Sequence, residues 1–98
     1  MDEIKHDQAV ELYRQLARNE LSAFDVLRLE ESLKGRKVVA SKDLDYGNVI
    51  IPIGTVGTIY DFGASSGAPI VKWMYQGFES IADLGKHCIL LDSDSPIS

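Results

Sequence analysis

Glycine and proline are confined to the last two thirds of this 98-residue chain. All eight glycines and all three prolines lie at position 35 or later. Because these residues weaken the interior of a helix more than any others, the first third can form uninterrupted helices, whereas the remainder is divided by frequent turns. The distribution predicts one α+β domain, with a helical arm in residues 1–35, a compact sheet in 36–92 and a flexible tail in 93–98.

The helical arm is expected to contain two antiparallel helices, a helical hairpin, rather than one bent helix. Residues 7–19 carry apolar side chains at helical spacing. Ser22 is a favourable N-cap, and Asp25 follows it at the position where an acidic residue complements the start of a helix. Gly35 is typical of the residue that follows a helix C-terminus. Since a cap at Ser22 has no use inside a continuous helix, we expect a break near Asn19.

Apolar side chains occupy more than one face of this arm, which is more apolar surface than one small sheet can cover. The surplus predicts that the arm docks on a second copy of the chain or on another partner. A homo-oligomer formed through the arm is therefore one expectation. The side chains concerned are Leu12, Leu16, Phe24, Leu27, Leu29 and Leu33.

The remainder of the chain contains short segments rich in β-branched, aliphatic and aromatic residues, separated by turns. This spacing predicts an antiparallel sheet of five strands. Closure of the sheet into a small barrel would remove its exposed edges, so we expect a barrel. Residues 41–48 are expected to form a polar loop. The expected strands are 37–40, 55–60, 70–75, 78–82 and 88–91.

The segment 51–59 reads I-P-I-G-T-V-G-T-I and follows the strand and long polar loop of 37–48. This arrangement resembles the opening of SH3-like small barrels, the broad group that includes KOW-type modules and the small barrel subunits of photosynthetic and ferredoxin-dependent complexes. The apolar alternation at Val71 and Trp73 and the last short strand at 88–91 extend the resemblance over about residues 36–92. It implies a five-stranded SH3-like barrel and leaves the function open, because this fold hosts many functions.

The charge balance is acidic. Ten Lys and Arg residues against fifteen Asp and Glu residues give a net charge of −5. Proteins that bind nucleic acid usually carry a basic excess, so we expect a protein partner rather than nucleic acid. No apolar run is long enough to span a bilayer, the first residues do not resemble a secretory signal, and the single cysteine fits a reducing compartment. These features predict a cytoplasmic protein that does not bind membranes.

His87 and Cys88 are the first place to look for a nucleophile. Neighbouring residues on a strand point to opposite faces, so the pair would not readily hydrogen-bond, and we expect Cys88 to be a core residue. The acidic pairs at Asp43 and Asp45 and at Asp92 and Asp94 do not continue into a calcium loop. We therefore expect no enzyme activity, no metal and no cofactor.

Aromatic residues near the loops of the expected sheet are the candidate partner contacts. Trp73 fits either the core or a groove, and Tyr75 and Phe78 fit either a groove or packing against the helices. The main hypothesis is a protein-interaction module, acting as an accessory subunit or an inhibitor of a larger complex and binding through these aromatics and the arm. The candidate contacts are Tyr46, Trp73, Tyr75 and Phe78.

Two alternatives stay open. In the first, a small barrel binds nucleic acid by stacking bases on aromatic rings and contacting phosphates with basic side chains. The second is a site for a small ligand or for catalysis at an oligomer interface, built around His87 and Cys88. The candidate nucleic-acid contacts are Arg36, Lys37, Lys42 and Lys72.

Overall fold

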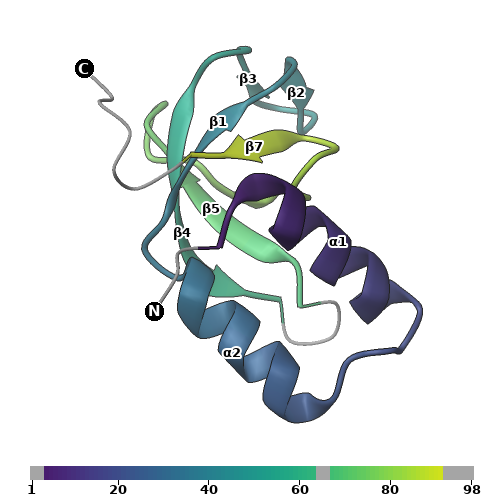
Figure 1. Ribbon diagram of the computed structural model, residues 1–98. Helices are drawn as coiled ribbons and strands as arrows, with labels where there is room; N and C mark the ends of the chain where they lie inside the picture. Colours follow the sequence, from purple (N-terminus) through teal and green to yellow (C-terminus); the bar gives the residue numbers. More distant parts are fainter. Residues whose placement is uncertain (1–3, 64–66, 92–98) are drawn as a thin grey trace.

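The structure, a computed structural model, describes residues 4–63 and 67–91 and contains two helices followed by seven strands (Figure 1). The predicted α+β class and the two separate helices are confirmed, whereas the predicted tail at 93–98 lies outside the described residues. Neither helix is long and apolar enough to cross a membrane. The elements are α1 (His6–Ala17), α2 (Ala23–Leu33), β1 (Lys37–Ala40), β2 (Leu44–Asp45), β3 (Ile50–Ile51), β4 (Val56–Phe62), β5 (Pro69–Trp73), β6 (Glu79–Ile81) and β7 (Cys88–Leu90).

The helix boundaries follow the capping residues in the sequence. The Ser22 hydroxyl oxygen accepts a hydrogen bond from the Asp25 N–H at 3.2 Å, which fixes the start of α2. Asn19 has a φ of 60° in the link between the helices, a backbone conformation that asparagine tolerates better than most residues. Gly35, with a φ of 88°, follows α2 and donates its N–H to the Ile59 carbonyl at 2.7 Å. The chain therefore passes directly from α2 onto the sheet.

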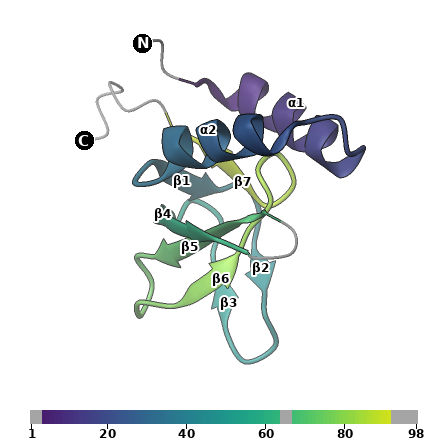
Figure 2. The ribbon, with the colours of Figure 1, turned by 90° about the horizontal axis from the view of Figure 1, so that it is seen from below.

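Five strands form one antiparallel sheet in the order β6-β5-β4-β1-β7. The remaining strands, β2 and β3, pair with each other as a separate hairpin. Figures 1 and 2 both place this hairpin at the end of the molecule opposite the helices. Barrel closure stays a prediction, because β6 and β7 are the two end strands of the sheet.

The expectation of a loop at 41–48 was wrong in one respect, because β2 lies within this segment. Leu44 pairs with Ile51, and both side chains are buried in the core. The turn between the strands is closed by the Asp45 carboxylate, which accepts the Gly47 N–H at 2.8 Å. A strand of two residues with one apolar side chain is too short for alternation to reveal, so only its tertiary contact identifies it.

One core fills the space between the helices, the β2–β3 hairpin and one face of the five-stranded sheet, which we name the inner face. The helices contribute Ala9, Leu29 and Leu33, and the hairpin contributes Leu44 and Ile51. Alternate residues of the strands point into this core, as expected for a sheet covered on one side. The inner-face residues are Val38, Ala40, Gly57, Ile59, Val71, Trp73, Cys88 and Leu90.

The tightest packing on the inner face joins Gly57 of β4 to Trp73 of β5, which lie opposite each other. A Cβ atom on Gly57 would lie 2.4 Å from Val71 Cγ1 and 2.9 Å from Trp73 Cε3, so no larger residue fits without movement. The indole N–H of Trp73 donates to the Ser80 hydroxyl at 3.0 Å, which satisfies the polar atom of this buried ring. The glycine is thus a requirement of the core.

Long-range hydrogen bonds join the helical arm to the sheet. His6 Nδ1 accepts the Leu90 N–H at 3.1 Å, and the Tyr13 hydroxyl donates to the Gly67 carbonyl at 3.2 Å. Arg36 donates to the carbonyls of Ile4 and Leu91, at 3.0 and 2.7 Å. These directional hydrogen bonds add to the apolar contacts in fixing the orientation of the arm. The arm and the sheet therefore pack as one structural unit.

Candidate functional site

The second face of the five-stranded sheet, which we name the outer face, carries an apolar row that crosses β7, β1 and β4 and ends at Met74, the first residue after β5. The pairing places Ile89 beside Val39 and Val39 beside Val56, and the Met74 N–H donates to the Val56 carbonyl at 2.8 Å. Met74 is 75% exposed and Ile89 is 42% exposed. Val39 and Val56 between them are half-buried, so the row is most open to solvent at its two ends.

A polar row follows next to the apolar row. The pairing places Thr58 between Lys37 and Lys72, and Glu79 beside Lys72. The Lys37 ammonium donates to the Thr58 hydroxyl at 3.0 Å. Glu79 Oε1 accepts the Tyr60 hydroxyl at 2.6 Å, and this hydrogen bond raises the pKa of Tyr60 because it favours the protonated phenol. Two lysines therefore stand together on the surface of an acidic protein.

Apolar side chains lie again on the far side of the polar row. Ile70 of β5 pairs with Ile81 of β6, and Ile81 is 50% exposed. Tyr60 also points outward and is 39% exposed. The outer face thus has a polar row of Lys37, Thr58, Lys72 and Glu79 with apolar side chains on both sides, and Asp61 stands beside Ile70. A polar row between apolar groups suits an amphipathic partner.

A shallow groove of about 500 Å³ crosses this face beside the β5–β6 turn. It brings together four of the predicted site residues, Lys37, Lys72, Trp73 and Tyr75. Gln76, with a φ of 59°, and Gly77, with a φ of 68°, form the turn, and positive φ at both central residues is typical of a type I′ hairpin. Trp73 itself is 1% exposed, so it belongs to the core, one of the two positions predicted for it.

The other two aromatic candidates, Tyr46 and Phe78, lie away from this groove. Their ring centroids are 5.4 Å apart at an interplanar angle of 43°, and the Tyr46 hydroxyl donates to the Ile81 carbonyl at 3.1 Å. Both rings are half-buried and pack against the core. They attach the β2–β3 hairpin to β6, so packing accounts for both residues, although not packing against the helices.

The four basic candidates also separate. Lys37 and Lys72 share the outer face, whereas Lys42 lines a different shallow cavity with Tyr46 and His87. Arg36 is buried, and its guanidinium donates to the main-chain carbonyls of Ile4, just before α1, and Leu91, just after β7. Its predicted role as a phosphate contact is therefore withdrawn, because these hydrogen bonds hold the guanidinium inside the protein. The sequence could not reveal this, since both acceptors are backbone atoms distant along the chain.

Cys88 and His87 do not form a catalytic pair in this structure. The Cys88 side chain is fully buried, and burial, with a smaller contribution from the charge of Asp83, raises the pKa of the thiol to about 12. His87 Nδ1 accepts the Asp83 N–H at 3.1 Å. The reactive thiolate form is therefore disfavoured, and Cys88 is a core residue as expected. Within residues 4–63 and 67–91, no group of three or more His, Cys, Asp or Glu side chains is placed to hold a metal ion.

Sequence reasoning did not identify the apolar row. A signal exists, because a strand with one solvated face normally alternates apolar and polar residues. The runs V-V-A in β1 and C-I-L in β7 instead carry an apolar residue at the outward position, which is Val39 or Ile89. On α2, by contrast, the exposed Phe24 and Leu27 belong to the surplus apolar surface that the sequence predicted for the arm, and the Arg28 guanidinium lies 5.8 Å from the centre of the Phe24 ring.

The chain matches no protein-family model, no curated protein and no solved structure.

Proposed function

We propose that this protein is an interaction module that binds a segment of another protein on the outer face of its sheet. The observation that carries the proposal is the apolar row of Ile89, Val39, Val56 and Met74, which crosses β7, β1 and β4 to the end of β5 and of which Met74 and Ile89 are exposed among the described residues. Contiguous apolar surface of this kind marks interaction sites in soluble proteins, because exposing it to water is unfavourable.

The polar row specifies the chemistry of the partner. Lys37 and Lys72 place two positive charges between the apolar groups of the outer face, against one negative charge at Glu79, while the chain as a whole carries a net charge of −5. A complementary partner presents an acidic side chain between apolar side chains. Electrostatic complementarity of this kind favours one partner over others and sets the register of binding more than it adds affinity.

A module of this size acts as an accessory subunit or an inhibitor of a larger complex. The SH3-like barrel stays part of the proposal, and the consecutive antiparallel strands around β1 support it. In this arrangement β7, β1, β4 and β5 form a continuous rigid platform. Binding to a preformed sheet costs little ordering entropy on the side of the module.

The first test is site-specific photo-crosslinking in the cells that naturally produce the protein. A photoreactive amino acid replaces Met74, which is 75% exposed on the outer face, and in a matched variant it replaces Phe24, which is 66% exposed on α2. We expect a discrete protein adduct from position 74 and none from position 24. An adduct only from position 24, or one whose mass equals a second copy of this chain, would contradict the proposal.

Charge reversal then tests the stated partner chemistry. The double variant Lys37→Glu/Lys72→Glu should lose the position-74 adduct, whereas Lys34→Glu/Lys42→Glu, with the same change in net charge, should keep it. Loss in both double variants would show that only the net charge matters. Recovery of a nucleic-acid adduct at position 74 would instead favour the nucleic-acid alternative, since Lys37, Lys72 and Tyr75 line one groove.

A further inference from the structure

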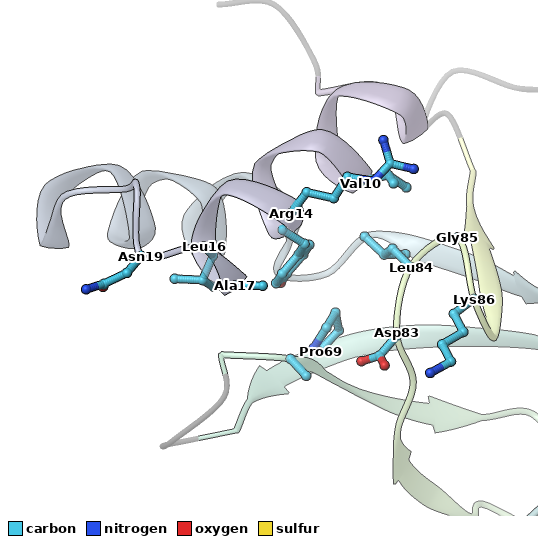
Figure 3. A pocket seen from close by; sticks show the side chains of 12 residues that line it. Val10, Arg14, Leu16, Ala17, Asn19, Pro69, Asp83, Leu84, Gly85 and Lys86 are labelled. Carbon is cyan, nitrogen blue, oxygen red and sulfur yellow. The ribbon is translucent and has the colours of Figure 1, made fainter.

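A second feature is a cavity of about 810 Å³ between α1, the start of β5 and the loop 83–86 (Figure 3). It is open to solvent on one side, and α1 approaches the chain closely at two points of its border. A Cβ on Gly85 would lie 3.0 Å from Val10 Cγ2, and a Cβ on Gly67 would lie 3.2 Å from Leu16 Cδ2. The volume is in the range of small-molecule sites.

The lining of this cavity is mainly apolar. Val10, Leu16 and Ala17 of α1 face Pro69 and Leu84 across it. The Tyr13 ring also lines it, with the hydroxyl donating to the Gly67 carbonyl at 3.2 Å. Burial raises the pKa of Tyr13, so the hydroxyl stays a neutral donor in this bond. The cavity can therefore hold an apolar group of several carbon atoms.

Two opposite charges stand on one wall of the cavity. In Figure 3 the side chains of Asp83 and Lys86 extend from the same loop toward the side where Pro69 lies, while the guanidinium of Arg14 extends away from them. Arg14 pairs instead with Glu11 at 3.5 Å. The polar wall thus offers one carboxylate and one ammonium group to a ligand.

These two groups are not neutralised by each other. Among the described residues, no lysine or arginine nitrogen lies within 4.0 Å of the Asp83 carboxylate, and the Lys86 ammonium makes no ion pair. His87 Nδ1 lies 3.9 Å from the carboxylate, and the same nitrogen accepts the Asp83 N–H at 3.1 Å. Both charges are therefore open to groups of opposite sign on a ligand.

The loop holds the backbone of Asp83 and Lys86 in a fixed relation. The Asp83 carbonyl accepts the N–H groups of Lys86, His87 and Cys88 at 3.3, 2.9 and 3.3 Å. Gly85 has a φ of 86° and donates its N–H to the Cys88 carbonyl at 2.8 Å. A tight turn that is also packed against Val10 presents Asp83 and Lys86 with little freedom of the backbone, which lowers the entropic cost of binding.

We propose that this cavity binds a small zwitterion with an apolar body, namely a free α-amino acid with an aliphatic side chain. Its ammonium group pairs with Asp83, its carboxylate pairs with Lys86, and its side chain fills the apolar lining. Charge-assisted hydrogen bonds from both ends would orient the ligand, and burial of the side chain would provide the hydrophobic contribution.

Isothermal titration calorimetry with three matched ligands tests the proposal. The ligands are leucine, 3-methylbutylamine, which is leucine without its carboxylate, and 4-methylpentanoate, which is leucine without its ammonium. We expect leucine to bind about tenfold more tightly than either analogue. Absence of leucine binding up to its solubility limit, or equal affinity for leucine and one analogue, would overturn the proposal.

Single substitutions then assign each end of the ligand. Asp83→Asn should weaken leucine about tenfold without affecting 4-methylpentanoate, and Lys86→Met should weaken leucine by a similar factor without affecting 3-methylbutylamine. Glu31→Gln and Lys34→Met make the same charge changes at exposed positions on and after α2 and should leave all affinities unchanged. Leucine affinity that falls equally in the control variants, or that survives both loop substitutions, would exclude this site.

A last variant tests the location by filling the cavity. Ala17 lines it from an exposed position of α1, so Ala17→Phe should abolish leucine binding while far-UV circular dichroism stays unchanged. Retained binding in the folded variant would place the ligand elsewhere.

Discussion

The two faces of the five-stranded sheet are made from alternate residues of the same strands, yet they have different physical roles. On the inner face, Val38, Val71 and Trp73 are buried by the helices and by the β2–β3 hairpin. On the outer face, Val39 and Met74 are neighbours of these residues in sequence but contact solvent. The comparison distinguishes buried apolar residues, which stabilise the fold, from exposed apolar residues, which are available for binding.

This separation matters because folding gains little from the outer face. Apolar area stabilises the fold only where it leaves water, and on the outer face most of Met74 does not. Substitutions there should therefore change binding with little effect on stability, while the same substitutions one residue away should unfold the protein. The following predictions test this contrast.

The largest effect is expected at Trp73. Trp73→Ala should lower the free energy of unfolding by about 4 kcal/mol, because it removes the largest buried side chain and leaves a cavity. Met74→Ala, at the next residue, should change it by less than about 0.5 kcal/mol. Urea unfolding followed by circular dichroism measures both, since the first variant has no tryptophan fluorescence. Similar losses in the two variants would refute the contrast between the faces.

A smaller but still clear loss is expected at Gly57. Gly57→Ala should destabilise the protein by about 2 kcal/mol, since the new methyl group would lie 2.4 Å from Val71 Cγ1. Thr58→Ala, at the adjacent outward position, should cost no more than about 1 kcal/mol, as an ordinary change in strand preference. The thermal unfolding midpoints of the two variants measure this difference. A Gly57→Ala protein as stable as the wild type would mean that β4 and β5 move apart easily to accept the methyl group.

The hydrogen bond to the Trp73 ring is expected to contribute less. Ser80→Ala leaves the buried indole N–H without its acceptor at 3.0 Å and should cost about 1 kcal/mol. Glu79→Ala removes the acceptor of the exposed Tyr60 hydroxyl and should cost less than about 0.5 kcal/mol. Urea midpoints of both variants test the order, and a larger loss at Glu79 would reverse it.

The smallest effect at neutral pH concerns the Cys88 thiol. Its pKa is raised from 9.0 to about 12, so the unfolded chain loses this proton first as the pH rises. The contribution of the neutral thiol to the free energy of unfolding is fully present below pH 9, and it decreases between pH 9 and about 12. Cys88→Ala should therefore lose less stability than the wild type between pH 8 and about 10, measured by urea unfolding. Equal pH dependence would show that the thiol titrates normally.

Alkylation provides an independent check of the same thiol. At pH 8 the native protein should react with iodoacetamide about a thousandfold more slowly than the urea-unfolded chain, because the thiolate is the reactive form. Rapid native alkylation would indicate that the strand around Cys88 opens readily.

Much of the fold was predictable because its determinants are local. The Ser22 side chain caps the start of α2, and Gly35 adopts the positive φ that commonly follows the end of a helix. Both effects are local, so neither depends on distant contacts. Strand β1 was predicted with the bounds that the structure shows, and β4, β5, β6 and β7 within a few residues. The exceptions, β2 and β3, are two-residue strands that pair with each other, and the burial of Leu44 depends on Ile51 and the core.

The candidate site was predictable only in part. Lys37, Lys72 and Tyr75 were named from their residue types, and the strand pairing brings them to one groove. Arg36 is basic like the three lysine candidates, but its hydrogen bonds to the carbonyls of Ile4 and Leu91 make it structural. Nothing local distinguishes a buried arginine from an exposed one when its acceptors are distant backbone carbonyls.

The sequence by itself determined where helices and most strands begin and end, since capping, turn residues and alternation act over a few neighbouring positions. Only the tertiary structure decided which face of each strand is covered and which side chains meet. It placed Val39 beside Ile89 and Val56, and it set Asp83 and Lys86 on one wall below α1. The reason is that pairing and burial join residues far apart along the chain, whereas local preferences are the same for a strand with either face outward.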